Sequence, residues 1–410
     1  MTGLAFGQAP PPSLPLRFLL AAPAWGVVAG AWLALHGTEI MASRWTPATL
    51  VLVHVLALGV LGNAMLGSLV QFLPVAAGSP MPGRRAVPAL HLAFNAGIAA
   101  LLPALVPGTA VPAALAAVLL GGSLCAFATL ALAGLARGSG PVATRAGIAA
   151  ALLALLATMA MGLRLLAARH GWLGPLAWPL VDLHAATGIG GWMLGLLVAV
   201  GATAMPMLQG TAAWTTRQVA IAWALLATAL VVAAAAASGA VPAPMWRVVA
   251  LPLAPLALAA WWRQWRAPHH RGPVLRRFWA SGCIGLLFAV AIAAWPEPLA
   301  FDRTLAVAAL VLAVALPLLV VGMLLEIVAF LAWIRLRQQV PRGTRIPGVG
   351  SLFPAPDKRR VWTLHVLASL ATVAAVARPT IAGAAGIAMA WAYAATLRGA
   401  WRCWRTPLSS

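Results

Sequence analysis

The sequence predicts an all-α membrane protein, a polytopic bundle of about twelve transmembrane helices, on three observations. First, 63% of the 410 residues are hydrophobic and only 8% are charged, whereas soluble domains carry roughly 25% charged residues. Second, apolar runs long enough to cross a hydrocarbon core of about 30 Å recur along the chain. Third, most basic residues fall in alternate connections between these runs. This composition excludes a soluble enzyme.

Clusters of Gly, Pro and Arg divide the chain into twelve segments of roughly membrane-spanning length. The first six run from Leu16 to Leu35, Pro47 to Val75, Val87 to Leu105, Val111 to Leu135, Ala146 to Leu166, and Leu180 to Met207. The second six run from Gln218 to Ala237, Met245 to Trp262, Trp279 to Trp295, Leu305 to Ile334, Val361 to Ala377, and Ile381 to Leu397. We expect them to form one integral membrane domain over residues 1–410.

The basic residues predict the orientation of these segments, because short cytoplasmic loops retain Lys and Arg. With both termini in the cytoplasm, 21 of the 27 basic residues lie on the cytoplasmic side. We therefore expect a multi-pass protein of the bacterial inner membrane, with the lipid bilayer as its partner. The net charge of +21 then needs no nucleic acid. The longest loop, Arg337 to Arg360, contains four prolines and is expected to be irregular.

Five ionisable residues are expected to lie inside the hydrocarbon core, where a charge is costly and each such group is a functional hypothesis. They are His54, His91, His184, Glu326 and His365. For His91, Glu326 and His365 we favour hydrogen bonding at helix ends, with a proton path or a second ligand set as the alternative. Gln71 is a further polar candidate in the second segment.

The second and sixth segments resemble each other. His54 precedes Pro74 by 20 residues and His184 precedes Pro206 by 22. The tenth segment keeps part of the pattern, because Gly322, Glu326 and Ala329 have the spacing of Gly67, Gln71 and Pro74. This predicts a four-helix unit used three times, over approximately residues 16–135, 146–262 and 279–397.

Small residues near these two histidines predict a slot for a flat cofactor. Gly188, Gly191 and Gly195 share a helical face with His184, and Gly59, Asn63, Gly67 and Gln71 form a stripe below His54. A neutral imidazole in apolar surroundings is a good axial ligand for haem iron, so His54 and His184 are the candidate cofactor and metal ligands. The alternative is that small residues at this spacing let membrane helices pack closely.

The second segment, with His54 followed by Gly62-Asn63 and by the run FLPVAAG, resembles subunit I of haem-copper oxidases. Its outer-end His and inner-end Pro are also similar to those of NnrS-type membrane proteins, which are associated with nitric oxide metabolism. The resemblance implies twelve helices in three four-helix arcs and a haem-ligating His at position 54.

The departures from this pattern argue against an oxidase or reductase. The seventh segment has no His, and the adjacent pair His269-His270 follows the eighth segment instead. Val55-Leu56 follows His54, where the NnrS-type metal motif differs. The binuclear-centre histidines are therefore missing, and we expect an accessory protein and no enzyme.

The resemblance implies an inner-membrane protein that holds haem, or alternatively copper, and serves respiration or nitrogen-oxide metabolism beside other respiratory membrane subunits. A second hypothesis is a cofactor-free permease or proton-coupled transporter, whose histidines and Glu326 line a route through the membrane. A third is a structural membrane component whose polar groups only hold helices together.

Overall fold

The computed structural model describes residues 9–106, 108–175, 177–341 and 346–407. These residues form helices and turns, and no β-strand occurs among them. Twelve helices in this part of the chain are long and apolar enough to cross a membrane, which confirms the predicted fold class. Helices suit this setting because they satisfy every backbone group within one segment. The chain is thus a multi-pass membrane protein in contact with lipid.

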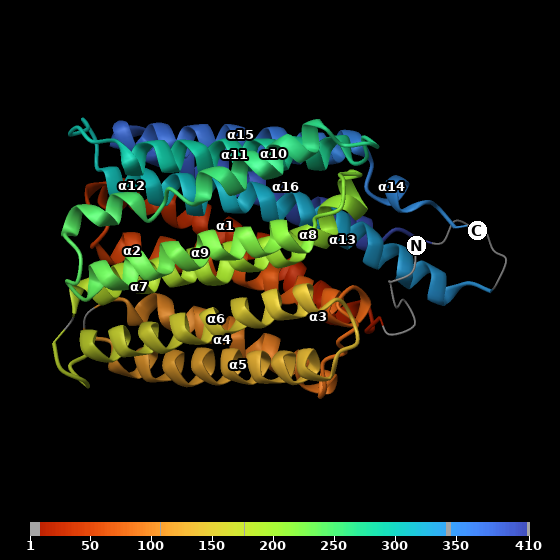
Figure 1. Cartoon of the computed structure of the whole chain (residues 1–410), viewed down its shortest axis with the longest axis horizontal. Coiled ribbons are helices and arrows are strands. Elements are labelled where there is room, and N and C mark those ends of the chain that lie inside the picture. Colours follow the sequence, from red (N-terminus) through yellow and green to blue (C-terminus); the bar gives the residue numbers. More distant parts are fainter. Residues whose placement is uncertain (1–8, 107, 176, 342–345, 408–410) are drawn as a thin grey trace. The chain divides into compact units, whose positions relative to one another are not determined.

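Each span overlaps one predicted segment, and its ends differ from the predicted ones by at most seven residues (Figure 1). The first half comprises α1 (Ser13–Ala42), α2 (Pro47–His54) with η2 (Val55–Gly62) and α3 (Asn63–Val75), α4 (Val87–Ala104), α5 (Ala110–Arg137), α6 (Val142–Arg169), and α7 (Trp178–Ala186) with η4 (Thr187–Leu194) and α8 (Gly195–Gln209). The second half comprises α9 (Thr216–Ala237), α10 (Leu253–Trp265), α11 (Pro273–Ala294), α12 (Arg303–Ala308) with η6 (Ala309–Ala315) and α13 (Leu316–Gln339), α14 (Val349–Leu352), α15 (Ala355–Ala377), and α16 (Ala382–Trp404). Short 3₁₀ turns precede α4, α10 and α16 at Arg84–Ala86, Ala243–Val248 and Pro379–Ile381.

Local sequence signals fix several helix ends. Thr215 and Gln218 form a reciprocal capping box at the start of α9. The Asp302 carboxylate caps α12 by accepting hydrogen bonds from the backbone N–H groups of Thr304 and Leu305, at 2.7 and 3.0 Å. Helix α8 ends at Gly210, whose φ of 73° is a left-handed conformation that favours glycine.

The predicted irregular loop from Arg337 to Arg360 is largely wrong. Helix α13 continues to Gln339, the short helix α14 follows, and α15 begins at Ala355, so the basic residues 358–360 are helical. Pro356 occupies the first turn of α15, where its missing N–H costs no hydrogen bond. The prolines near position 355 therefore mark the start of a helix, where the sequence had indicated a loop. Residues 342–345 of this loop lie outside the described part of the chain.

Three spans contain a π-helical segment, and they are the three that the sequence pattern aligns. Segments η2 and η4 each begin nineteen residues before a proline, Val55 before Pro74 and Thr187 before Pro206. Segment η6 lies in the tenth span, which lacks the outer His. Single π-turns often mark functional sites, and a run of two turns at one repeated position is unusual. The sequence did not predict these segments.

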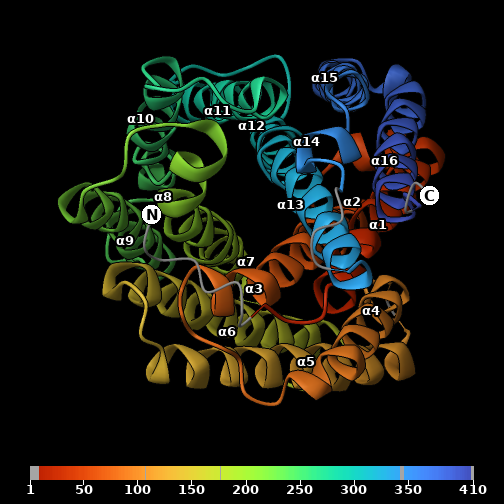
Figure 2. The same cartoon turned by 90° about the vertical axis from the view of Figure 1, so that its right-hand side faces the viewer.

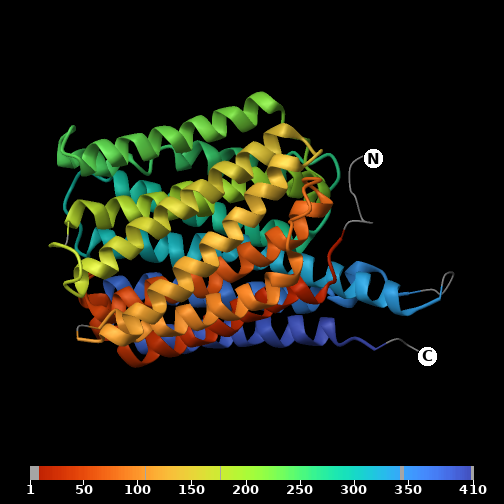
Figure 3. The same ribbon diagram turned by 90° about the horizontal axis from the view of Figure 1, so that it is seen from below.

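The described residues group into two compact units. The first unit consists mainly of Val70–His269 and holds α4 to α10. Within it α5 packs between α4 and α6, and these orange and yellow helices run side by side in Figure 3. Helix α6 also packs on η4 and α8. The predicted repeats at residues 16–135, 146–262 and 279–397 stay a prediction.

The second unit consists of Pro10–Leu69, His270–Ala289 and Glu297–Ser410. Its most extensive contact joins the first and last spans, α1 and α16, drawn red and dark blue beside each other in Figure 2. Helix α16 also packs on α15 and α13, and α1 packs on η2. The two ends of the chain thus build one core.

Glycine permits this close contact between α1 and α16. A Cβ placed on Gly30 would lie 2.2 Å from the backbone nitrogen of Ala390, and one on Gly386 would lie 2.2 Å from that of Ala34. Gly26 likewise faces the ring of Tyr393. Because lipid gives helices no hydrophobic reason to associate, such backbone-to-backbone approach is a main source of their attraction.

We predict that Gly30→Leu destabilises the protein by about 1–3 kcal/mol, because α1 and α16 must separate to admit the side chain. Gly122→Leu on α5 is the matched control, since no atom lies within 4 Å of the position of its Cβ. Unfolding free energies from denaturant titration in detergent micelles measure both. Equal stability of the two variants would contradict glycine-mediated packing.

Candidate functional site

His54 is the last residue of α2 and directly precedes the π-helical segment η2. It is half-buried. Its Nδ1 lies 2.7 Å from the backbone carbonyl oxygen of Leu50. A carbonyl oxygen can only accept, so Nδ1 carries the hydrogen and donates it. Nε2 of the neutral ring then carries the lone pair.

His184 lies on α7, three residues before η4, and is also half-buried. Its Nδ1 lies 3.0 Å from the backbone oxygen of Thr158 on α6, so it too donates from Nδ1. The bond crosses from one helix to the next, whereas that of His54 stays within α2. Gly162 leaves room for this ring, because a Cβ there would lie 3.0 Å from His184 Cε1.

Both histidines therefore have the tautomer of a typical metal ligand. Metal-binding histidines almost always donate one ring N–H to a carbonyl or carboxylate, which fixes the tautomer and the orientation of the ring. His54 belongs to the second unit and His184 to the first. Each fits the donor chemistry that haem iron or copper requires.

The expected glycine slot is wrong, because neighbouring side chains fill it. Beside His184, a Cβ on Gly191 would lie 2.7 Å from Ala154, and one on Gly195 would lie 2.8 Å from Trp223. Below His54, a Cβ on Gly59 would lie 2.8 Å from Trp25 of α1. These glycines serve helix packing, the alternative that the sequence left open.

The polar residues below His54 in the second span differ in whether their side chains have hydrogen-bond partners. The Asn63 side chain is fully buried and donates a hydrogen bond to the carbonyl of Gly59, at 2.9 Å. Gln71 is 7% exposed, and neither of its amide atoms has a hydrogen-bond partner within the described part of the chain. His91 is half-buried on α4, and its backbone oxygen accepts a hydrogen bond from Asn95.

Glu326 has a partner that the sequence analysis missed. Its Oε1 lies 2.7 Å from Nζ of Lys358, and their side chains are only 18% and 9% exposed. Glu326 is on α13 and Lys358 on the second turn of α15. Because the sequence placed Lys358 in a loop, its burial was not foreseen. One signal was available, since Lys358 is the only lysine among the 27 basic residues.

His365 lies two turns further along α15 and is 4% exposed. Its Nε2 lies 2.9 Å from the hydroxyl oxygen of Thr396 on α16, and that hydroxyl donates to the carbonyl of Ala392. The hydroxyl hydrogen is thus committed, so His365 donates from Nε2. The edge of Tyr393 packs on the ring with centroids 4.7 Å apart. This hydrogen bond joins α15 to α16 inside the second unit, away from the helix end where the sequence placed His365.

No group of three or more His, Cys, Asp and Glu residues that could hold a metal ion occurs among the described residues. This finding applies to metal sites that need three or more protein ligands. It does not test a haem site, because haem iron takes only one or two axial ligands from the protein.

No known protein-family model matches the chain, and no curated protein matches it. The resemblance to haem-copper oxidases and NnrS-type proteins therefore stays a prediction.

We predict that the Glu326–Lys358 pair is strongly coupled. Removing one partner of a buried ion pair leaves an uncompensated charge and costs about 3–5 kcal/mol, whereas apolar replacement of both is often near neutral. Lys358→Met should therefore destabilise the protein more than the double variant Glu326→Leu with Lys358→Met. The unfolding free energies of Lys358→Met, of Glu326→Leu and of the double variant, each compared with the wild type, form a double-mutant cycle that measures the coupling. Additive losses would show that the charges do not interact.

Proposed function

We propose that the chain is an inner-membrane protein that holds haem, with copper as the alternative metal, through the imidazoles of His54 and His184. Its role is accessory, in respiration or in nitrogen-oxide metabolism. The observation that carries the proposal is the shared tautomer of the two rings. Both donate Nδ1–H to a backbone carbonyl, at 2.7 and 3.0 Å, which is the hydrogen bond that metal-binding histidines typically make.

The position of the two rings supports this role. His54 lies directly before η2, and His184 lies three residues before η4. A π-helix changes the rotation between residues before and after it, so it can re-aim a side chain without breaking the span. The predicted threefold repeat would explain why such a segment recurs at this depth.

The residues of this chain fix, orient and shield such a group. The carbonyls of Leu50 and Thr158 hold the two imidazoles, and half-burial limits their contact with water. Haem iron supplies a one-electron redox centre or a site for a diatomic gas when bound. The adjacent pair His269-His270 follows α10 and belongs to no span, which favours an accessory role over oxygen reduction.

The test is an optical spectrum of the detergent-purified protein, oxidised and dithionite-reduced. We expect a Soret band that is reduced at least several-fold in His54→Ala and in His184→Ala, because each variant removes an axial ligand. The control is His36→Ala, since His36 is a half-exposed residue near Glu39 on α1. A spectrum without a Soret band would exclude haem, and a Soret band that both variants leave unchanged would exclude these two histidines as its ligands.

The second candidate is a proton-coupled permease, which the Glu326–Lys358 pair favours. The chain uses Arg at every basic position except one, and that lysine is the residue that meets the intramembrane acid. Arg stays charged in proteins, whereas the lysine ammonium can release a proton. The pair could therefore exchange a proton, Glu326 accepting one or Lys358 releasing one.

Further polar groups continue from the pair along one face of α15. His365, Ser369 and Thr372 are all buried, and with Lys358 they follow spacings of seven, four and three residues. This face extends about 21 Å along the helix. A line of this length crosses much of a hydrocarbon core of about 30 Å.

Proton flux into proteoliposomes under a potassium diffusion potential tests this candidate. We expect Lys358→Arg to reduce the flux to that of empty liposomes, because it preserves the charge and removes the releasable proton. Glu326→Gln should do the same, and Glu297→Gln, which changes an exposed acid, should leave the flux unchanged. Wild-type flux in Lys358→Arg would show that the lysine carries no proton.

A further inference from the structure

Helix α10 differs from every other span in how little of it is covered by protein. In the span Met245–Trp265, which ends with α10, only 11% of the apolar stretch is buried inside the structure, whereas the other spans range from 22% to 72%. Its side chains therefore meet lipid or a ligand along most of their length.

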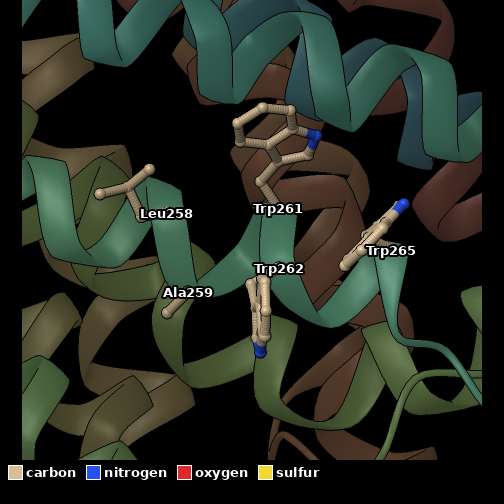
Figure 4. Close-up of a pocket in the computed structure, with 5 residues that line it drawn as sticks. All are labelled: Leu258, Ala259, Trp261, Trp262 and Trp265. Atoms are coloured by element: carbon tan, nitrogen blue, oxygen red, sulfur yellow. The ribbon is translucent and has the colours of Figure 1, made fainter.

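A cavity of about 570 Å³ lies against this helix (Figure 4). It is lined by Leu258, Ala259, Trp261, Trp262 and Trp265. In Figure 4 the indoles of Trp261, Trp262 and Trp265 extend from the helix in different directions, and the ring centroids of Trp262 and Trp265 lie 5.5 Å apart. The lining is almost wholly apolar, and because all five residues belong to α10 the cavity is an open groove along this helix.

Positive charge lies at one end of this cavity. The guanidinium of Arg266 stacks 4.2 Å above the ring of Trp262, and Arg266 is exposed. One turn earlier, Arg263 donates to the carbonyl of Ala212 at 2.9 Å and stacks on Trp214 at 4.0 Å. Arg263 thus ties the α8–α9 connection to the end of α10, while Arg266 faces outward.

That connection also buries polar atoms beside the basic end of α10. Gln209 is fully buried and Thr211 is 6% exposed, and in the described part of the chain neither side chain has a hydrogen-bond partner. The indole nitrogen of Trp214 is likewise buried without a hydrogen-bond partner among the described residues. Buried donors of this kind almost always meet a partner. They lie close to the connection that follows α10, because a Cβ on Gly210 would collide with the carbonyl of His269.

We propose that this cavity binds an anionic phospholipid. One acyl chain lies against Trp261, Trp262 and Trp265, and the phosphate is held by Arg266. Indoles prefer the boundary between hydrocarbon and headgroups, and basic groups beside spans attract anionic lipid. The site is thus an apolar groove that ends in a cation, which is the chemistry of a phospholipid and of neither a free anion nor a sugar.

Charge favours a lipid over a second copy of the chain. A symmetric dimer through α10 would bring the same surface of both copies together. The exposed Arg266 of each copy would then face its own counterpart, and α10 contains no acidic residue to offset this charge. An anionic headgroup removes this repulsion.

Native mass spectrometry of the delipidated full chain tests the proposal, with dioleoyl phosphatidylglycerol and dioleoyl phosphatidylcholine as probes. We expect one preferred phosphatidylglycerol site that Arg266→Gln weakens about fivefold, as for one basic group near anionic lipid. Arg266→Lys should restore most of it, and Trp262→Ala should weaken both lipids. Arg402→Gln, an exposed arginine in the last turn of α16, is the control and should change binding less than twofold.

Three results would overturn the site. Equal losses in Arg266→Gln and Arg402→Gln would mean diffuse attraction to a basic surface. Competition by soluble glycerol phosphate at the concentrations where the lipid binds would mean that the groove takes no acyl chain. A dimer that Trp262→Ala dissociates would assign this face to a second copy.

Discussion

The absence of water from the hydrocarbon core is the constraint on which the rest of this structure depends. Every backbone group must be satisfied within its own helix, and polar side chains follow the same rule. Asn63 donates to Gly59, Ser68 to Ala64, and Thr158 to Ala154, each to the carbonyl four residues earlier. His54 does the same with Leu50. What remains for contact between helices is close packing and a small number of polar pairs.

Glycine therefore has one role in both units, which is to bring helices together. Gly30 and Gly386 admit a backbone at α1 and α16, and Gly191 admits Ala154 beside His184. The same small residues at the same spacing predicted a cofactor slot, because sequence does not reveal which neighbour fills the space. The case for haem consequently depends on the imidazoles and their tautomers and not on a glycine-lined cradle.

The spans could be predicted because hydropathy and helix length are tied to bilayer thickness, and Pro47–Val75 matches the prediction at both ends. Three features could not. The π-helical segments that begin at Val55 and Thr187 have no signal in the hydrophobic periodicity, which marks a span and not its helix type. Lys358 was assigned to a loop because prolines precede it, although proline also starts helices. The two compact units depend on contacts between distant parts of the chain.

A bound cofactor at the two imidazoles is the central claim, and content analysis of the purified wild-type protein tests it most directly. Pyridine haemochrome assay and elemental analysis, both normalised to protein, measure haem, iron and copper together. The account predicts haem iron, or copper, in at least equimolar amount to the chain. Protein purified from cells with ample iron and copper that contains neither metal would contradict it, and would leave the ion pair of Glu326 and Lys358 as the functional centre.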